Sequence, residues 1–316
     1  PTTYVLYTAE GRGGFDHGQV IKSYSCQMKL EPGKLYSFKV TALNKGGESF
    51  PSETLSALYN PKARNTILIV NNFHRLASPQ VIDNEYEQGF DFKKDPGVSY
   101  GLTAGWSGKQ IIFDKAKMGN ETSAGLGHCG NEMAGHFIAG NDFNYTVEHA
   151  RAIADANLYS IVSCSSEAIV SGKVQMSRYP VVDLINGLER NDGYTREYYK
   201  AFSPTMMTKL KTYTMGGGNL FASGSYTGSD MQTDEEKAFL ANTLKLSYAP
   251  SDSIQPTANA TGLGLQFTYY NTLNAKHYAA THPEILQPID GAICGIQYDN
   301  GASAGVGYQG NGYHCF

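Results

Sequence analysis

Polar side chains suited to acid–base chemistry follow several stretches of this sequence that are predicted to be buried strands. Residues 67–70 are all large aliphatics, a pattern typical of a strand buried on both faces of a sheet. Because the carboxyl ends of parallel strands meet at one edge, we expect the polar groups that follow such strands to converge there. These groups are Asn72, His74 and Arg75; Ser165, Ser166 and Glu167; Glu189 and Arg190; and Ser223, Ser225 and Asp230.

Such a set of side chains could hydrolyse a glycan or an amide bond. A carboxylic acid can donate and accept the proton, and an arginine can hold an anionic group of the substrate. The structural alternative is that strand ends are polar in any α/β sheet, where serines cap helices and acids pair with arginines. The hydrolytic interpretation assigns catalysis to Glu189, His74 and Asp230, and substrate binding to Asn72, Arg75, Ser165, Glu167, Arg190 and Trp106.

Complete catalytic and metal-binding motifs are absent from the sequence. The serines after Cys164 lack the flanking glycines of a nucleophile elbow, so capping of the next helix is the favoured interpretation. His128, Glu132 and His136 have the spacing of one helical face, but nearby glycines argue against a regular helix there. We therefore predict no metal and no cofactor. Aromatic residues that could stack on sugar rings are Phe90, Phe92, Tyr100 and Trp106.

Alternating strand and helix patterns predict a doubly wound parallel sheet over residues 61–316. Residues 76–136 interrupt this pattern and are predicted to form a long insertion over the carboxyl edge of the sheet. Residues 247–316 are β-rich and end within a predicted strand, as expected of a piece of a longer chain. Strands are predicted at 67–70, 159–163, 180–185 and 219–223, and helices at 145–156, 204–215 and 233–245.

Residues 1–60 have a different, β-rich pattern. Strands are predicted at 4–7 and 23–30, and alternation from Tyr36 to Ala42 indicates a half-buried strand after the turn at Pro32-Gly33. This stretch resembles the second half of a fibronectin type III domain, in which Tyr36 would be the tyrosine-corner residue. Because a complete sandwich needs about 100 residues, the resemblance implies a partial one.

Composition excludes several classes of function. The 316 residues have a net charge of −4 without a basic cluster, so no nucleic-acid partner is expected. No apolar stretch is long enough to span a membrane. The five cysteines are scattered and are expected to be buried free thiols that pack as small hydrophobic residues, although one disulfide stays open. Only 17% of the residues are charged and 35 are glycines, a composition common in secreted or periplasmic bacterial proteins.

The order of these motifs resembles a group of secreted bacterial multidomain proteins labelled xanthan lyase or N-acetylmuramoyl-L-alanine amidase. The most specific parts are the segments at residues 181–190 and 216–230. The α/β part resembles, more distantly, the class I glutamine-amidotransferase-like fold, which is flavodoxin-like. That fold carries a cysteine nucleophile where this chain has residues 186–190, which contain neither Cys nor Ser.

The resemblance implies a secreted, periplasmic or cell-surface protein that processes polysaccharide or peptidoglycan. We expect this chain to be an accessory, glycan- or cell-envelope-binding region that works with other domains of the same polypeptide. The alternative is a hydrolase that uses the carboxylate, arginine and histidine groups at the strand ends.

Overall fold

A computed structural model describes the following residues of the chain: 3–49, 51–73, 80–91, 110–114, 128–130, 144–187, 189–191, 199–248, 257–269, 280 and 283–316. Contacts divide the chain into two compact units. The first comprises Pro1–His74, Phe143–Thr268 and Pro283–Phe316, and the second comprises Arg75–Asp142 and Tyr269–His282.

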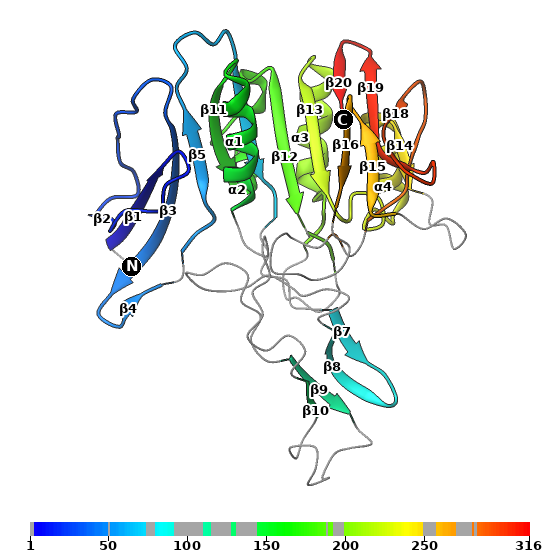
Figure 1. The fold of residues 1–316 in the computed structure, drawn as a ribbon, viewed down its shortest axis with the longest axis horizontal. Helices are drawn as coiled ribbons and strands as arrows, with labels where there is room; N and C mark the ends of the chain where they lie inside the picture. Colours follow the sequence, from blue (N-terminus) through cyan, green and yellow to red (C-terminus); the bar gives the residue numbers. More distant parts are fainter. Residues whose placement is uncertain are drawn as a thin grey trace. The chain divides into compact units, whose positions relative to one another are not determined.

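Most of the described strands of the first unit belong to one mixed sheet of 14 strands, with parallel strands in its centre (Figure 1). The central order is β11-β6-β12-β13-β20, and each neighbouring pair in it is parallel. The predicted parallel strands are confirmed. The sheet is mixed rather than purely parallel, because antiparallel strands extend it on both sides. The central strands are β6 (Thr66–Asn71), β11 (Ser160–Ser165), β12 (Val181–Gly187), β13 (Asn219–Gly224) and β20 (Tyr313–Cys315).

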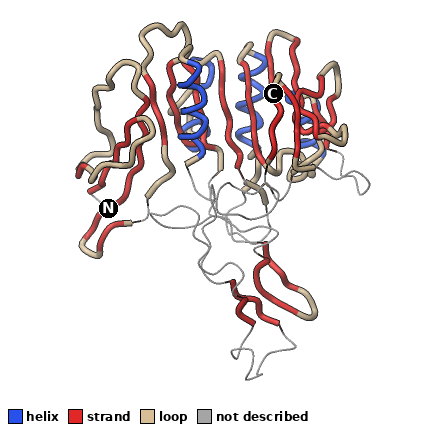
Figure 2. The backbone as a smooth tube through the Cα atoms, in the orientation of Figure 1, coloured by secondary structure: helices blue, strands red, loops and turns tan. Residues whose placement is uncertain are grey.

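Helices cover the two faces of this central sheet unequally (Figure 2). Alternate side chains such as Leu68 and Leu184 pack with α2, α3 and α4 on one face, and Ile69 and Ile185 pack with α1 on the other. Both faces of β6 are thus buried, which explains its unbroken aliphatic run. The helices are α1 (Tyr145–Ala156), α2 (Ser166–Val170), α3 (Pro204–Met215) and α4 (Asp234–Phe239), with η3 (Met176–Arg178) and η4 (Leu240–Leu244) as short 3₁₀ and π turns.

The N-terminal strands extend one side of the same sheet. They run antiparallel in the order β5-β3-β1-β2, with β4 beside β3, and β5 bonds to β11 where Leu58 faces Ile161. The described strands therefore form a single layer rather than the two packed sheets of a sandwich. The strands are β1 (Thr3–Glu10), β2 (Gln19–Ile21), β3 (Leu35–Asn44), β4 (Gly47–Glu48) and β5 (Leu55–Leu58).

Two local predictions for the N-terminal layer have opposite outcomes. The hydroxyl of Tyr36 accepts a hydrogen bond from the backbone N–H of Glu31 at 3.4 Å, as expected of a tyrosine corner. The strand predicted at 23–30 does not form, and only Gln19–Ile21 pairs with β1.

Antiparallel strands also extend the other side of the sheet, in the order β20-β19-β18-β15-β16. A turn at 299–302 joins β18 to β19, as its Asp-Asn-Gly sequence predicts. A separate pair, β14-β17, lies outside the large sheet. These strands are β14 (Leu246–Tyr248), β15 (Asn259–Gly262), β16 (Leu265–Thr268), β17 (Leu286–Pro288), β18 (Ile293–Tyr298) and β19 (Ser303–Gly310).

In the second unit, the described residues form one antiparallel sheet in the order β10-β9-β8-β7. These strands are β7 (Gln80–Asp83), β8 (Glu87–Asp91), β9 (Gln110–Asp114) and β10 (His128–Gly130). Among the described residues of either unit, no helix has the length and apolarity needed to cross a membrane.

Candidate functional site

The carboxyl ends of β6 and β12 are joined by two buried asparagines. The backbone N–H of Asn72 donates to the carbonyl of Ile185 at 2.8 Å. Its side-chain amide donates to Asn186 Oδ1 at 2.7 Å and to the carbonyl of Ala201 at 2.9 Å. Only 4% of Asn72 and 1% of Asn186 is exposed. Asn72, predicted as a binding residue, thus bridges two strand ends.

Asp230, predicted as catalytic, anchors the loop that follows β12 through hydrogen bonds. One of its carboxylate oxygens accepts the N–H of Asn191 at 3.0 Å, and the other accepts the N–H of Ala201 at 2.8 Å. Burial raises the pKa of Asp230 in spite of these hydrogen bonds. The carboxylate therefore holds both flanks of the segment between Asn191 and Ala201.

A buried ion cluster lies beside this carboxylate. The ammonium of Lys200 donates to the main-chain oxygen of Asp230, and it lies 3.1 Å from Glu236 Oε1 and 3.6 Å from Asp230 Oδ1. Burial alone would raise the pKa of Glu236, but hydrogen bonds from Thr233 and Lys200 outweigh it and lower that pKa. Glu236 also completes the capping box of α4 with Thr233. The cluster thereby connects the loop after β12 with the start of α4.

The structure brings Glu189 and Arg190 to the same edge of the sheet. Glu189 is 1% exposed, and its N–H donates to the carbonyl of Asn186 at 2.9 Å. The guanidinium of Arg190 lies over the ring of Tyr226, 4.5 Å from its centroid, which is a cation–π contact. The loops after β12 and β13 are thus packed together, as expected of loops that follow neighbouring parallel strands.

Ser165 and Glu167 lie at the end of β11, on the far side of β6 from β12. Ser165 occupies the N-cap position of α2, but its side chain makes no capping hydrogen bond, so the predicted cap is wrong in this respect. Glu167 is exposed in the first turn of α2. Three further predicted site residues, His74, Arg75 and Trp106, lie outside the described residues and stay predictions, as do the sugar contacts of Phe92 and Tyr100.

Glu284 belongs to the strand-end region but carries no sequence signal. Its two carboxylate oxygens accept the N–H groups of Gly228 at 2.7 Å and Ser229 at 2.9 Å, in the loop after β13. Burial raises its pKa above the ordinary value of 4.5 even though these hydrogen bonds lower it. The residue lies in an irregular stretch before β17, where no periodicity or motif distinguishes it.

We expect Glu284→Gln to flatten the pH dependence of stability. A carboxyl group whose folded pKa is raised favours folding below its unfolded pKa, and this contribution is lost as pH rises through the folded pKa. The free energy of unfolding of the wild type, measured with urea, should therefore fall more between pH 4.5 and pH 7 than that of the variant. Identical pH profiles would contradict the assignment. Glu235→Gln, at an exposed position in the first turn of α4, is the control.

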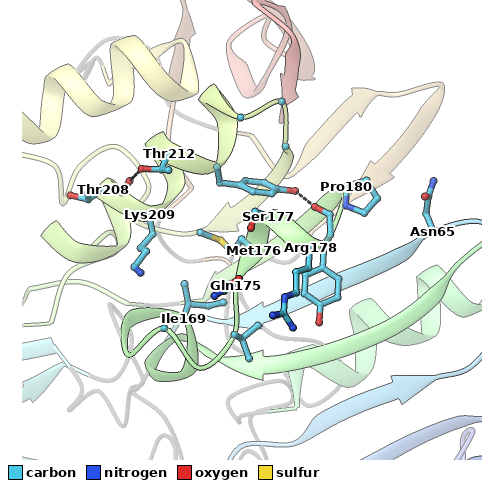
Figure 3. A pocket seen from close by; sticks show the side chains of 17 residues that line it. Asn65, Ile169, Gln175, Met176, Ser177, Arg178, Pro180, Thr208, Lys209 and Thr212 are labelled. Atoms are coloured by element: carbon cyan, nitrogen blue, oxygen red, sulfur yellow. Dashed lines mark hydrogen bonds between the residues drawn. The ribbon is translucent and has the colours of Figure 1, made fainter.

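A groove of about 750 Å³ lies at the opposite end of the sheet (Figure 3). It runs between α3 and the segment that connects α2 to β12, beside the amino ends of β6, β12 and β13. The sequence-based prediction placed the site at the carboxyl ends of the strands and not at this position. A second cavity, of about 200 Å³, lies beside Phe221 and Phe316.

The floor of the groove is made of buried, hydrogen-bonded side chains. Ile169, Met176 and Tyr213 contribute to it and are at most 5% exposed, because they belong to the core between the sheet and α3. The hydroxyl of Tyr213 donates to the carbonyls of Tyr179 at 2.9 Å and Asn219 at 3.1 Å, which ties α3 to the starts of β12 and β13. A pocket with such a floor is formed before any ligand arrives.

The rim of the groove is polar and carries positive charge. Thr208 and Thr212 are exposed on α3, and their hydroxyls donate to main-chain oxygens at 3.0 and 2.9 Å, so each keeps its oxygen lone pairs for a ligand. The other polar side chains on the rim are Asn65, Gln175, Ser177, Arg178 and Lys209. Such a rim on an apolar floor suits a ligand with several hydroxyl groups.

The described residues contain neither a metal cluster nor a disulfide. No three His, Cys, Asp or Glu side chains among them come together in a way that could hold a metal ion. Cys26, Cys164, Cys294 and Cys315 are free. The prediction that the free thiols are buried is confirmed for Cys164 and Cys315 and is wrong for Cys26 and Cys294, which are exposed. Burial raises the pKa of Cys164 to about 12 and that of Cys315 to about 11, so both thiols stay protonated and unreactive at neutral pH.

No protein-family model matches the sequence, and no match among curated proteins is significant. The functional conclusion therefore depends on the geometry and on the sequence motifs.

Proposed function

We propose that this chain is a non-catalytic, glycan-binding region of a secreted bacterial protein that processes polysaccharide or peptidoglycan. The observation that carries the proposal is the preformed groove between α3 and the α2–β12 connection, with its apolar floor and hydroxyl-bearing rim. Its volume of about 750 Å³ falls in the range of small-molecule sites and would accept a short run of sugar units.

The state of the strand-end carboxylates supports binding over catalysis. A general acid or base needs an accessible carboxyl group within hydrogen-bonding reach of the substrate. Asp230 is occupied by two backbone N–H groups and Lys200, and Glu189 is buried. Both residues serve the packing of the loops, which fits the structural interpretation of the polar strand ends.

The order of the central strands supports a flavodoxin-like fold for the α/β part. Numbered along the chain, β6, β11, β12, β13 and β20 become 1 to 5, and their spatial order is 2-1-3-4-5. This is the order of flavodoxin-like sheets. The tyrosine corner at Tyr36 similarly supports kinship of the N-terminal layer with fibronectin type III modules.

Blocking the groove should abolish glycan binding. Thr212→Trp places an indole at the exposed rim, whereas Thr205→Trp adds the same group on α3 at an exposed position that does not line the groove. In affinity electrophoresis against a panel of polysaccharides and in pull-down with peptidoglycan, we expect the first variant to lose at least tenfold in affinity and the second to match the wild type. If the wild type binds none of these ligands, the proposal is wrong.

A hydrolase is the second candidate, and one observation favours it. Asp230 and Glu284 both have raised pKa values, and the charge of Asp230 contributes to the shift of Glu284. Raised carboxyl pKa values are typical of general acids. Release of reducing ends or amines from a polysaccharide or peptidoglycan by the wild type, lost in Asp230→Asn with the fold retained, would establish this candidate instead.

A further inference from the structure

The groove has two cationic side chains, one from each of its walls. Lys209 projects from α3 and Arg178 from η3, and Figure 3 shows Gln175 between them. Arg178 is exposed and Lys209 is half-buried. Among the described residues, neither cation forms an ion pair, in contrast to Lys200 with its two carboxylates.

The residues that line the groove include no aspartate or glutamate. The groove is therefore a cationic site on a chain whose net charge is −4. Two cations without a neighbouring carboxylate attract the negative charges of an anionic polymer to this groove. A guanidinium also offers a planar pair of N–H donors that matches a carboxylate.

From this geometry we propose that the groove selects glycans that carry carboxylate groups over neutral glycans of the same backbone. This inference depends on the proposed glycan binding and specifies its ligand class. A carboxylate of one sugar pairs with Arg178, and Lys209 attracts a carboxylate of a neighbouring sugar. Hydroxyl groups of the ligand donate to the oxygens of Thr208 and Thr212, while the apolar floor contacts the ring.

The test compares two probes with the same backbone. Oligogalacturonate presents one carboxylate per sugar, and its fully methyl-esterified form presents none. We expect calorimetric titration of the wild type to give at least tenfold tighter binding of the acid form. Arg178→Met and Lys209→Met should each weaken binding of the acid form about three- to tenfold and leave binding of the ester within about twofold.

A matched control and a third probe distinguish the outcomes. Lys211→Met removes a cation from an exposed position of α3 that does not line the groove, and it should bind like the wild type. Equal affinity for both forms, blocked by Thr212→Trp, would overturn the charge selectivity while leaving glycan binding intact. Absence of binding to either form overturns both. The third probe is dextran sulfate, a polymer of higher charge density that has no carboxylates. If it binds more tightly than oligogalacturonate and all binding is lost at 0.15 M salt, binding follows charge density alone and the selectivity for carboxylates is overturned.

Discussion

Lys200→Met should destabilise the protein by about 3–5 kcal/mol, because it leaves two buried carboxylates without their cation. In the wild type the ammonium lies between Asp230 and Glu236, and its side chain is 3% exposed. Without it, the two like charges repel each other in a poorly solvated site, and the main-chain oxygen of Asp230 loses its donor. Urea unfolding followed by circular dichroism would measure the loss.

The same substitution at the surface provides the control. Arg12 pairs with Asp155 at 3.3 Å, but the two side chains are 77% and 71% exposed, so Arg12→Met should change stability by about 1 kcal/mol or less. The deficit of Lys200→Met should also shrink as pH falls from 7 to 5, since protonation of the two carboxyl groups relieves their repulsion. An equal, small effect of both variants would show that the buried cluster adds nothing.

Gly218→Ala should cost about 1–3 kcal/mol through overpacking. A Cβ atom at this position would overlap the ring of Tyr213. The ring cannot move away easily, because its hydroxyl bonds to two main-chain carbonyls and the side chain is 5% exposed. Thermal unfolding and the near-UV circular dichroism of the tyrosines would report the lower stability and the altered packing.

Gly216 offers the matched control two residues earlier. A Cβ atom there would lie 3.4 Å from the carbonyl oxygens of Thr212 and Tyr213, and the backbone has an ordinary φ of −80°. Gly216→Ala should therefore change stability by no more than about 0.5 kcal/mol. Since Tyr213 forms part of the floor of the groove, Gly218→Ala should also weaken glycan binding. Equal melting temperatures for the two variants would rule out the overlap.

The central elements were predictable because their signals are local. The aliphatic run of β6 indicates burial on both faces. Ser203 and Pro204 mark the start of α3, because the serine side chain caps a free N–H of the first turn and proline suits the first helical position. The segment 23–30 shows the limit of such signals. It has strand-forming residues but no partner strand, and pairing is a tertiary property that composition does not reveal.

The strand-end residues were predictable as neighbours, but their role was not. Topology alone brings Asn72, Glu189 and Asp230 to one edge, whereas their hydrogen bonds to backbone groups depend on loop conformation. Glu284 was missed because its partners lie more than 50 residues away in the sequence. The groove was missed because its walls come from surface positions of α3 and an irregular connection, which have no periodic pattern.

The hydrogen-bonded junction between β5 and β11 has a consequence for how the chain can be divided. Because β5 pairs with β11 at Leu58 and Ile161 and its flanking backbone also bonds to the hydroxyls of Ser160 and Ser163, cutting at residue 60 would expose the outer edge of β11. It would also uncover the core that Leu35 and Leu58 share with Ile161. A fragment that starts at residue 61 would present an aggregation-prone strand, so the N-terminal layer acts as the protective cap of the α/β sheet.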